Sequence, residues 1–504
     1  MQKRYFLVGL AAFCAAVSGL AQAPNHLSLE NLRHLQLLDV VLESPTSVAP
    51  DLRRDPHATA YVEMKGVIGG NIRFELLLPE AWNGRFVMGG GGGFVGTVQN
   101  SARDSVQHGY ATVGTDTGHE WQPGYSAAWA LDNVEAQLDF GYLAVHRTAE
   151  TAKALLRSYY GKEAAFSYFT GCSRGGGQAM MEAQRFPQDF DGIVAGAPAF
   201  NWTGLAATAV AISQKLYPDP AHLDHNVLTK EALQSLQKAI LEQCDAQDGL
   251  KDGIIQDPPT DHFDLSKVPD LTDEQRQAIN AIYQGARNDQ GPLYPGYSAA
   301  ECDPDQWRAW ITGPAPVLLA KDHAPSLMFA FGTQIFKYLI FNRPDWDYST
   351  YNFSNFQRDT HLAASFLNAT NSNLDPFKAH QGKLIIWHGW ADPALPPQAT
   401  VDYYRQLQAH DPNAAAYCRL FMVPGCLHCG GGPGASDVDW LSAIVDWVEH
   451  AQAPDKLIAS KRGPGPTVIT RPLYPYPQTA IYKGAGDPNS ADSFEVKSPS
   501  RAGD

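Results

Sequence analysis

The stretch Gly171-Cys172-Ser173-Arg174-Gly175 is the part of this chain that decides its fold. The aromatic residues 166–169 before it predict a short buried strand, and the small residues 176–183 after it predict the start of a helix. A Gly-x-Ser-x-Gly sequence between a strand and a helix is typical of a sharp, strained turn that presents the serine hydroxyl as a nucleophile. The alternative is a Gly/Ser turn without chemical function, and the agreement of strand, turn and helix argues against it.

A serine nucleophile needs a base and an acid, and two later stretches supply them in the chain order that this turn implies. The apolar residues 383–388 predict a strand that breaks at Gly389 and delivers Asp392 in the next loop. The apolar residues 419–423 predict another strand, and His428 follows it after a Pro-Gly pair. We expect His428 to be the general base and Asp392 to orient its ring. Any one of the 16 histidines, taken alone, would more often be structural or solvated, but the place of His428 after the last core strand favours it.

A run of five glycines, Gly89 to Gly93, follows the predicted strand 85–88. Backbone N–H groups in such a run can point into a site without obstruction, and alpha/beta-hydrolases take one oxyanion donor from this early loop. The N–H of Arg174, directly after the nucleophile, is the expected second donor. The alternatives are a flexible linker, which rarely follows a core strand, and a phosphate cradle, which would end in Gly-Lys-Ser/Thr.

With these motifs the sequence resembles the tannase and feruloyl esterase family of alpha/beta-hydrolases, which also includes hydrolases of terephthalate half-esters. The resemblance covers nearly the whole chain after its first residues and rests on segments 90–93, 116–119, 171–176, 185–193, 195–198, 388–392 and 423–429. It implies an α/β fold, with an alpha/beta-hydrolase core and a large inserted lid domain.

The resemblance also implies a disulfide beside the triad, between Cys172 and Cys429, the neighbours of the nucleophile and the base. It implies that Gly93 and Arg174 form the oxyanion hole. From the residues alone, the segment 426–429 could also be a Cys-x-x-Cys redox or zinc element. A zinc site would need a second ligand pair at similar spacing, and a thioredoxin-like motif would open a helix, and neither is visible.

The spacing of the triad predicts the domain organisation. About 220 residues separate Ser173 from Asp392, more than the next strands and helices of a hydrolase sheet need. We therefore expect an inserted lid domain at residues 201–369. The hydrolase core is then built from two parts, residues 24–200 and 370–504.

Inside the predicted lid, residues 244–255 carry three carboxylates and two Asp-Gly turns. Clustered carboxylates and turn carbonyls suit calcium, although the spacing is not that of an EF-hand. A plain surface turn is the alternative. The family resemblance favours a Ca2+ ion and implies as its ligands the side chains of Asp245, Asp248 and Asp252 with the backbone oxygens of Leu250 and Ile254. Because the loop is distant from the triad, we expect the ion to be structural.

The remaining cysteines depart from the family pattern. Asp261 stands where the usual partner of Cys244 would be, and Cys302 is a candidate replacement. Cys418 begins a predicted core strand and is expected to be a small buried hydrophobe. Cys426 has no assigned role.

The first residues of the chain predict an exported protein. Residues 1–23 have a basic start, an apolar centre and small residues near the expected cut, which is typical of a signal peptide rather than a membrane span. We therefore expect a secreted or periplasmic protein, in a compartment where disulfides persist. The net charge of −15 argues against nucleic acid as a partner, and no later run of about 18 apolar residues indicates a membrane partner. The sequence does not indicate an oligomeric state.

Taken together, the residues predict acyl transfer to water through a covalent acyl-enzyme. The family resemblance implies esters of aromatic acids, with feruloyl-esterase-like or tannase-like activity as the leading pair and terephthalate half-ester hydrolysis as the alternative. A serine peptidase and a non-catalytic, calcium-dependent glycan-binding protein are candidates from other classes. Seven lid aromatics could sandwich a substrate ring, although most are expected to fill the lid's own core: Tyr217, Trp307, Trp310, Phe329, Phe331, Phe336 and Tyr338.

Overall fold

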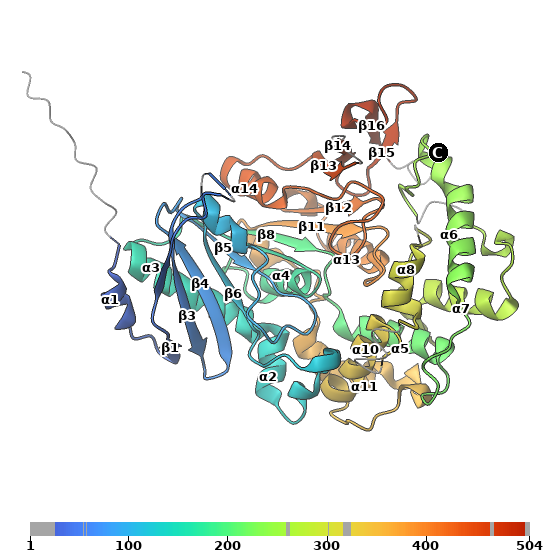
Figure 1. Ribbon diagram of the computed structural model, residues 1–504, viewed down its shortest axis with the longest axis horizontal. Coiled ribbons are helices and arrows are strands. Elements are labelled where there is room, and N and C mark those ends of the chain that lie inside the picture. Colours follow the sequence, from blue (N-terminus) through green and yellow to red (C-terminus); the bar gives the residue numbers. More distant parts are fainter. Residues whose placement is uncertain are drawn as a thin grey trace, which may run out of the picture.

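A mixed β-sheet runs through the centre of the molecule (Figure 1). The computed structural model describes residues 26–53, 55, 56, 58–258, 263–300, 302–315, 324–463 and 468–498, and the sheet has ten strands within these ranges. The predicted signal peptide and Asp261 lie outside the described residues.

The parallel half of the sheet carries the motifs singled out in the sequence. Its strands lie in the order β6 Ala111–Thr115, β5 Arg85–Gly89, β7 Phe166–Cys172, β8 Gly192–Gly196, β11 Lys383–Gly389 and β12 Cys418–Val423. The four strands predicted from apolar runs are thus confirmed, each within a few residues of its expected bounds. Antiparallel strands extend the sheet beyond β6: β4 Ile72–Pro79, β3 Tyr61–Ile68, β1 Val40–Leu42 and β2 Thr46–Val48.

Helices cover both faces of the parallel strands, because successive side chains on a strand point to opposite sides. On β7, Tyr168 packs in a cluster with Ile444 and Trp447 of α14 Trp440–His450, whereas Phe169 belongs to the larger core. That larger core includes the helices on the other face: α3 Ala144–Tyr160, α4 Arg174–Arg185 and α13 Pro397–His410. The strands are therefore buried on both sides, as parallel strands usually are.

The long segment between β8 and β11 forms the right-hand part of Figure 1, in green and yellow. Its main elements are α5 Trp202–Leu216, α6 Lys230–Cys244, α7 Asp273–Gln284, the strands β9 Ala286–Asn288 and β10 Gly291–Tyr294, α10 Leu327–Gln334 and α11 Phe356–Leu367. The sheet continues across it, since β8 pairs directly with β11. The N–H of Ala369 donates to the Phe200 carbonyl at 2.7 Å, so the two ends of the predicted lid lie side by side.

Candidate active site

Ser173 lies in the turn between β7 and α4, where the sequence predicts the nucleophile. Its backbone has φ 63° and ψ −122°, a combination that non-glycine residues rarely adopt. A Cβ at Gly171 would lie 2.6 Å from the carbonyl carbon of Gly175, and a Cβ at Gly176 would lie 2.2 Å from the Gly196 oxygen. The glycines around the serine are therefore required by the close approach of the turn to α4 and β8.

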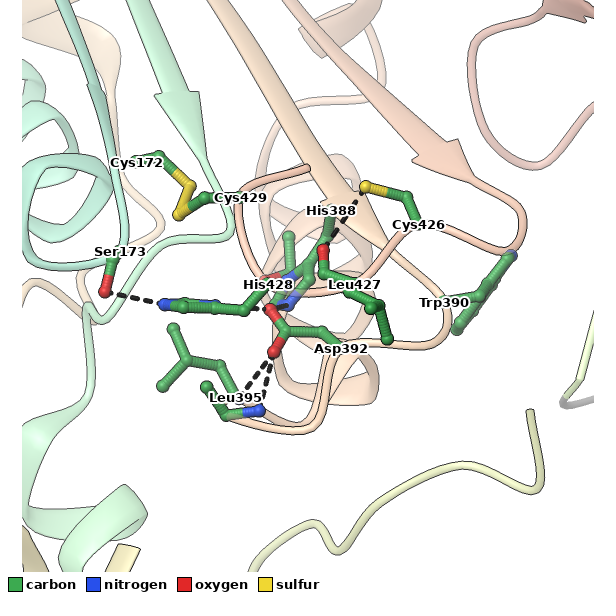
Figure 2. A network of polar contacts seen from close by, with 12 residues as sticks. Cys172, Ser173, His388, Trp390, Asp392, Leu395, Cys426, Leu427, His428 and Cys429 are labelled. Carbon is green, nitrogen blue, oxygen red and sulfur yellow. Dashed lines mark hydrogen bonds and ion pairs between the residues drawn. A yellow bond between two sulfur atoms is a disulfide. The ribbon is translucent and has the colours of Figure 1, made fainter. Parts of the chain in front are cut away.

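A chain of hydrogen bonds joins Ser173, His428 and Asp392 (Figure 2). Ser173 Oγ lies 2.9 Å from His428 Nε2, and His428 Nδ1 lies 2.8 Å from Asp392 Oδ2. An ionised carboxylate only accepts, so Nδ1 carries the proton and Nε2 accepts from the serine hydroxyl. The three residues come from the loops after β7, β11 and β12, which meet because the carboxyl ends of parallel strands share one edge of the sheet.

Four hydrogen bonds converge on Asp392, whose side chain is 0% exposed. Its Oδ1 accepts the N–H groups of Ala394 at 2.7 Å and Leu395 at 3.1 Å, and its Oδ2 accepts from His428 and from His388 Nε2 at 3.1 Å. Burial alone raises the pKa of Asp392, but the charges and hydrogen bonds of the two histidines outweigh burial and hold the pKa below its usual range. Asp392 is therefore an ionised, fixed partner for His428.

His388 is a site residue that the sequence pattern does not single out. It lies on β11 and is buried, and its Nδ1 accepts from the Thr400 hydroxyl at 2.8 Å, which leaves the Nε2 proton to Asp392. The signal for it was a single histidine in an apolar strand, four residues before the acid. Only the structure identifies His388 as a site residue, because it shows that Thr400 of α13 bonds the other side of the ring.

A disulfide joins Cys172 and Cys429, as the family resemblance implies (Figure 2). The two Cα atoms lie 5.9 Å apart although 257 residues separate them in sequence. Cys426 does not pair with Cys429, and its thiol donates to the Leu427 carbonyl at 3.2 Å. Residues 426–429 are therefore not a Cys-x-x-Cys redox pair. No three His, Cys, Asp or Glu side chains of this segment and its described neighbours converge as metal ligands either.

The glycine run after β5 lines the same cavity as Ser173, and most of its N–H groups have acceptors. The Gly90 N–H donates to the Thr170 carbonyl at 2.9 Å, the Gly91 N–H to Gln178 Oε1 at 3.1 Å, and the Gly92 N–H to Gln99 Oε1 at 2.8 Å. Gly93, at φ 58°, follows these three, and no acceptor in the described part of the chain takes its N–H. The N–H of Arg174 is the first of α4 and has no partner within the helix. Both predicted oxyanion donors are thus without a competing acceptor for their N–H groups among the described residues, and their role remains a prediction.

Gln99 and Gln178 are further residues that the sequence pattern does not reveal. Gln178 is buried on the second turn of α4, and Gln99 comes from the segment between β5 and β6. Each side-chain oxygen accepts one glycine N–H and so fixes the loop that carries Gly93. The only sequence signal was a glutamine among small residues just after the nucleophile.

A cavity of about 650 Å3 opens at Ser173 and His428. Of the seven lid aromatics proposed from the sequence, Trp310 and Phe331 line it. The Trp310 ring stands 5.1 Å from the His428 ring at 67°. Tyr125 and Trp202 also line the cavity and were not predicted. The other five predicted aromatics pack inside the lid, and all of these but Tyr338 are fully buried: Tyr217, Trp307, Phe329, Phe336 and Tyr338.

The aspartates of the predicted calcium loop lie in one compact turn. Asp245 Oδ1 accepts the N–H groups of Asp252 and Gly253 at 3.1 and 2.9 Å. Burial, with the charges of Asp252 and Asp245, raises the pKa of Asp248 to about 6. The donor set is all oxygen, which suits calcium, and the crowded negative charge favours a cation. In this structure the carboxylate oxygens of Asp245, Asp248 and Asp252 do not all lie within 4.8 Å of one another. Asp252 Oδ2 instead pairs with Arg471 Nη2 at 2.8 Å. These side chains would therefore have to turn toward one another to bind an ion.

The other cysteines are buried: Cys244, Cys302, Cys418 and Cys426. Cys302 forms no disulfide in this structure, so the suggestion that it replaces the lost partner of Cys244 is wrong. Cys418 begins β12 and is fully buried, as predicted.

A parallel sheet with a serine at the strand-to-helix turn, and an acid and a histidine on neighbouring loops, defines a serine hydrolase of the α/β-hydrolase class. Within this class, one family matches the sequence. The model of the family "Tannase and feruloyl esterase" matches residues 62–497, and the chain belongs to this family of carboxylic ester hydrolases.

Individual relatives agree with the family assignment. The chain is 33% identical to the mono(2-hydroxyethyl) terephthalate hydrolase of Piscinibacter sakaiensis, over 85% of this chain and 82% of that protein. It is also 33% identical to a probable feruloyl esterase of Arthroderma benhamiae, over 83% and 81% of the two chains. Among solved structures, feruloyl esterase B from Aspergillus oryzae superposes with a TM-score of 0.79 at 26% identity, covering 93% of this chain and 100% of the other.

Proposed function

We propose that this chain hydrolyses esters of aromatic carboxylic acids through an acyl-enzyme on Ser173. The observation that carries the proposal is the hydrogen-bonded series Ser173, His428 and Asp392 at the wall of an apolar cavity. The relatives named as feruloyl esterases and the matching family model support the same reaction class.

The geometry gives each residue a step. Ser173 Oγ attacks the ester carbonyl carbon while His428 Nε2 takes its proton, and Asp392 stabilises the imidazolium that results. The N–H groups of Gly93 and Arg174 stabilise the oxyanion of the tetrahedral intermediate. Collapse of this intermediate expels the alcohol, which takes the proton from His428. Water then attacks the acyl-enzyme with His428 again as base, and the free acid leaves.

The walls of the cavity favour an aromatic acyl group. Trp310, Phe331 and Tyr125 offer ring faces and edges around the space in front of Ser173. The lining residues among those described include no lysine or arginine, so they offer no cation to the free carboxylate of a terephthalate half-ester. Feruloyl-type or galloyl esters are therefore the leading substrates, and the terephthalate half-ester named for the Piscinibacter sakaiensis relative is the second candidate.

A small ester panel tests this proposal. Purified enzyme and a Ser173→Ala control are incubated with methyl ferulate, methyl gallate and mono(2-hydroxyethyl) terephthalate, and the released acids are measured by liquid chromatography. We expect release of ferulate or gallate by the wild type alone. A preference for the half-ester would favour the second candidate. Cleavage of the matching amide but not the ester would favour a peptidase, and failure of a fluorophosphonate probe to label Ser173 would favour the non-catalytic glycan-binding protein.

We also propose that the lid holds a structural Ca2+ ion at Asp245, Asp248 and Asp252 with the carbonyl oxygens of Leu250 and Ile254. The crowding of carboxylates in one turn supports this. Bound there, the ion would neutralise the aspartates and stiffen the turn, and it takes no part in the reaction at Ser173.

Export to the periplasm or the medium is the third part of the proposal. The signal-like residues 1–23 and the disulfide beside the triad support it. No helix in the described ranges is long and apolar enough to cross a bilayer.

A further inference from the structure

Outside the active site, His146, Glu182 and Asp189 form a cluster on the inner side of α3 and α4. His146 lies on α3, Glu182 on the last turns of α4, and Asp189 in the loop that leads from α4 to β8. One ligand atom from each lies within 4.8 Å of the other two. Nowhere else in the described part of the chain do three His, Cys, Asp or Glu side chains converge in this way.

Glu182 makes this cluster different from an ordinary ion pair. The residue is 0% exposed, and neither of its carboxylate oxygens accepts a hydrogen bond from an N–H or O–H donor among the described residues. A buried carboxylate without a partner is strongly unfavourable, so such a group requires a proton or a cation. It faces Asp189, a second carboxyl group, closely enough for the two to share a proton in a hydrogen bond, and this proton is the alternative to a cation.

The neighbouring positive group, Lys153, meets this requirement only in part, because its charge lowers the pKa of Glu182 by less than burial raises it. Lys153 Nζ donates to the backbone carbonyl of Asp189, and no ion pair within 4 Å joins Lys153 to the carboxylate of Glu182 or Asp189 in the described structure. His146 Nδ1 bonds Asp189 Oδ2 at 2.6 Å, and its Nε2 faces Glu150 Oε2 at 3.4 Å. Within the cluster the imidazole thus bonds Asp189 and makes no hydrogen bond or ion pair with Glu182.

The imidazole is also held in a fixed orientation. Its ring stacks on Phe186 with centroids 3.8 Å apart and planes 6° apart. The side chains of His146 and Asp189 are 22% and 12% exposed, so one side of the cluster reaches solvent while Glu182 closes the other. An ion can therefore enter and still be largely enclosed.

We propose that His146, Glu182 and Asp189 bind a divalent transition-metal ion of the zinc type, which ties α4 to α3. One imidazole nitrogen and two carboxylate oxygens are a ligand set that zinc accepts, with water in the remaining position. Calcium takes six to eight oxygen ligands and does not match this set. The 2.6 Å contact between His146 and Asp189 lengthens when the ion enters between them. Because Ser173 is the N-cap of α4, the ion anchors the far end of the helix that follows the nucleophile.

The experiment measures binding of zinc alone to the full-length secreted enzyme. Protein treated with EDTA is desalted into metal-free buffer, titrated with ZnCl2 by calorimetry, and analysed for bound metal by mass spectrometry. Thermal melts are then recorded with and without excess zinc. We expect one zinc per chain, and at 100 times the Kd the folded-to-unfolded ratio should rise about 100-fold.

Glu182→Gln keeps the shape of the side chain and removes its charge, so the zinc equivalent should disappear. His146→Asn, at a partly exposed position, is the second variant in case Glu182→Gln folds poorly. His222→Asn is the matched control, because His222 also contacts an aspartate, Asp219 at 2.7 Å, but on the open surface and without a third ligand. This control should bind zinc as the wild type does.

The opposite result is a proton shared by Glu182 and Asp189 in place of the ion. In that case zinc changes neither the melting temperature nor the heat measured in the calorimetric titration, and Glu182→Gln is as stable as the wild type in metal-free buffer. That pair of results, or zinc binding that survives both Glu182→Gln and His146→Asn, would overturn the proposal.

Discussion

At the scale of single residues, the site depends on the charge that Asp392 keeps inside the protein. Two histidine rings and two backbone N–H groups stabilise the ionised form of this carboxylate. The ionised carboxylate in turn fixes the tautomer of His428, so that Nε2 faces Ser173 as an acceptor. His388 also belongs to the site, because its Nε2 is one of the four donors to Asp392.

Removing a triad member tests this arrangement. Ser173→Ala or His428→Ala should lower the rate of ester hydrolysis by roughly 10⁴-fold or more, because the three residues act as one unit. Asp392→Asn should be nearly as damaging, since an amide cannot stabilise the imidazolium. The measurement is the initial rate on the best ester of the panel, with circular dichroism to check folding. A Ser173→Ala sample, purified free of wild type, that kept a tenth of the activity would contradict the assignment.

Asp116, in the turn after β6, offers a pH test. Burial raises its pKa to about 6, although backbone N–H groups and Arg73 oppose this. Between about pH 4, the pKa of Asp116 in the unfolded chain, and pH 6, the folded protein keeps the Asp116 proton while the unfolded chain has lost it. The free energy of unfolding of the wild type therefore falls as the pH rises through this range. Asp116→Asn does not ionise. Its free energy of unfolding relative to wild type should therefore rise by up to about 3 kcal/mol between pH 4 and pH 7.

Urea unfolding of Asp116→Asn and wild type at pH 4.5 and 7.5 measures this difference. Other titrating groups are common to both proteins and cancel in the comparison. A stability difference that stays the same at both pH values would show that Asp116 has an ordinary pKa.

At the scale of elements, the glycine loop after β5 and the helix α4 hold the oxyanion hole together. Gln178→Leu removes the acceptor of the Gly91 N–H with little change in volume, so the loop that carries Gly93 should loosen. We expect kcat to fall by about 10- to 100-fold and KM to change much less, because the variant loses a buried hydrogen bond that positions the Gly93 N–H.

Gln184→Leu on the same helix is the control for Gln178→Leu. It removes the hydrogen bonds in which Gln184 donates to the Ala369 carbonyl at 2.6 Å and the Tyr403 hydroxyl at 3.3 Å and accepts from the Asn371 N–H at 3.0 Å. None of these bonds involves the glycine loop, so the variant should lower stability and leave kcat unchanged. Steady-state kinetics on both variants separates the two effects. Equal losses of kcat in both would mean that Gln178 acts only through stability.

The disulfide joins the end of β7 to the loop after β12. Replacing both Cys172 and Cys429 with serine should lower activity more than it lowers helix and strand content, because the bond holds Ser173 and His428 in register. In the chain-entropy model, closing so long a loop stabilises the fold by about 5 kcal/mol. Peptide mapping of the unreduced protein checks the bond itself. Finding Cys172 as a thiol, or joined to another cysteine, would remove this explanation.

At the scale of the whole molecule, the lid and the C-terminal strands meet at the predicted calcium loop. Arg471 on β14 Val468–Leu473 pairs with Asp252, and a Cβ at Gly249 would lie 3.4 Å from the Tyr482 carbonyl on β15 Thr479–Tyr482. An ion at this loop would therefore stabilise the contact between lid and core.

A calcium-selective chelator should lower the melting temperature and make the lid more sensitive to protease, with activity falling only as the lid loosens. Binding to the folded state alone stabilises it by about 2.7 kcal/mol at 100 times the Kd. Asp248→Ala should show the same lower melting temperature and no further response to chelator. The prediction fails if the purified protein holds no calcium and neither chelator nor added calcium moves the melt.

Much of the catalytic apparatus follows from local sequence. A strand, a strained Gly-x-Ser-x-Gly turn and a helix can be recognised in consecutive residues, because the strain and the hydrophobic patterns arise within them. Asp392 and His428 were found for the same reason, since each follows an apolar strand that ends at a glycine or proline. The pairing of Cys172 with Cys429 came from the family resemblance and not from spacing.

The residues that support the oxyanion loop and line the cavity were decided by tertiary structure. Gln178 meets Gly91 across 87 residues of sequence, and Tyr125 and Trp202 reach a cavity that the more distant Trp310 and Phe331 complete. Such contacts depend on how sheet, helices and lid pack, and no local pattern encodes a partner that far along the chain. The burial of Glu182 beside Asp189 is of the same kind, because a glutamate on a helix is ordinary until packing encloses it next to a second carboxyl group.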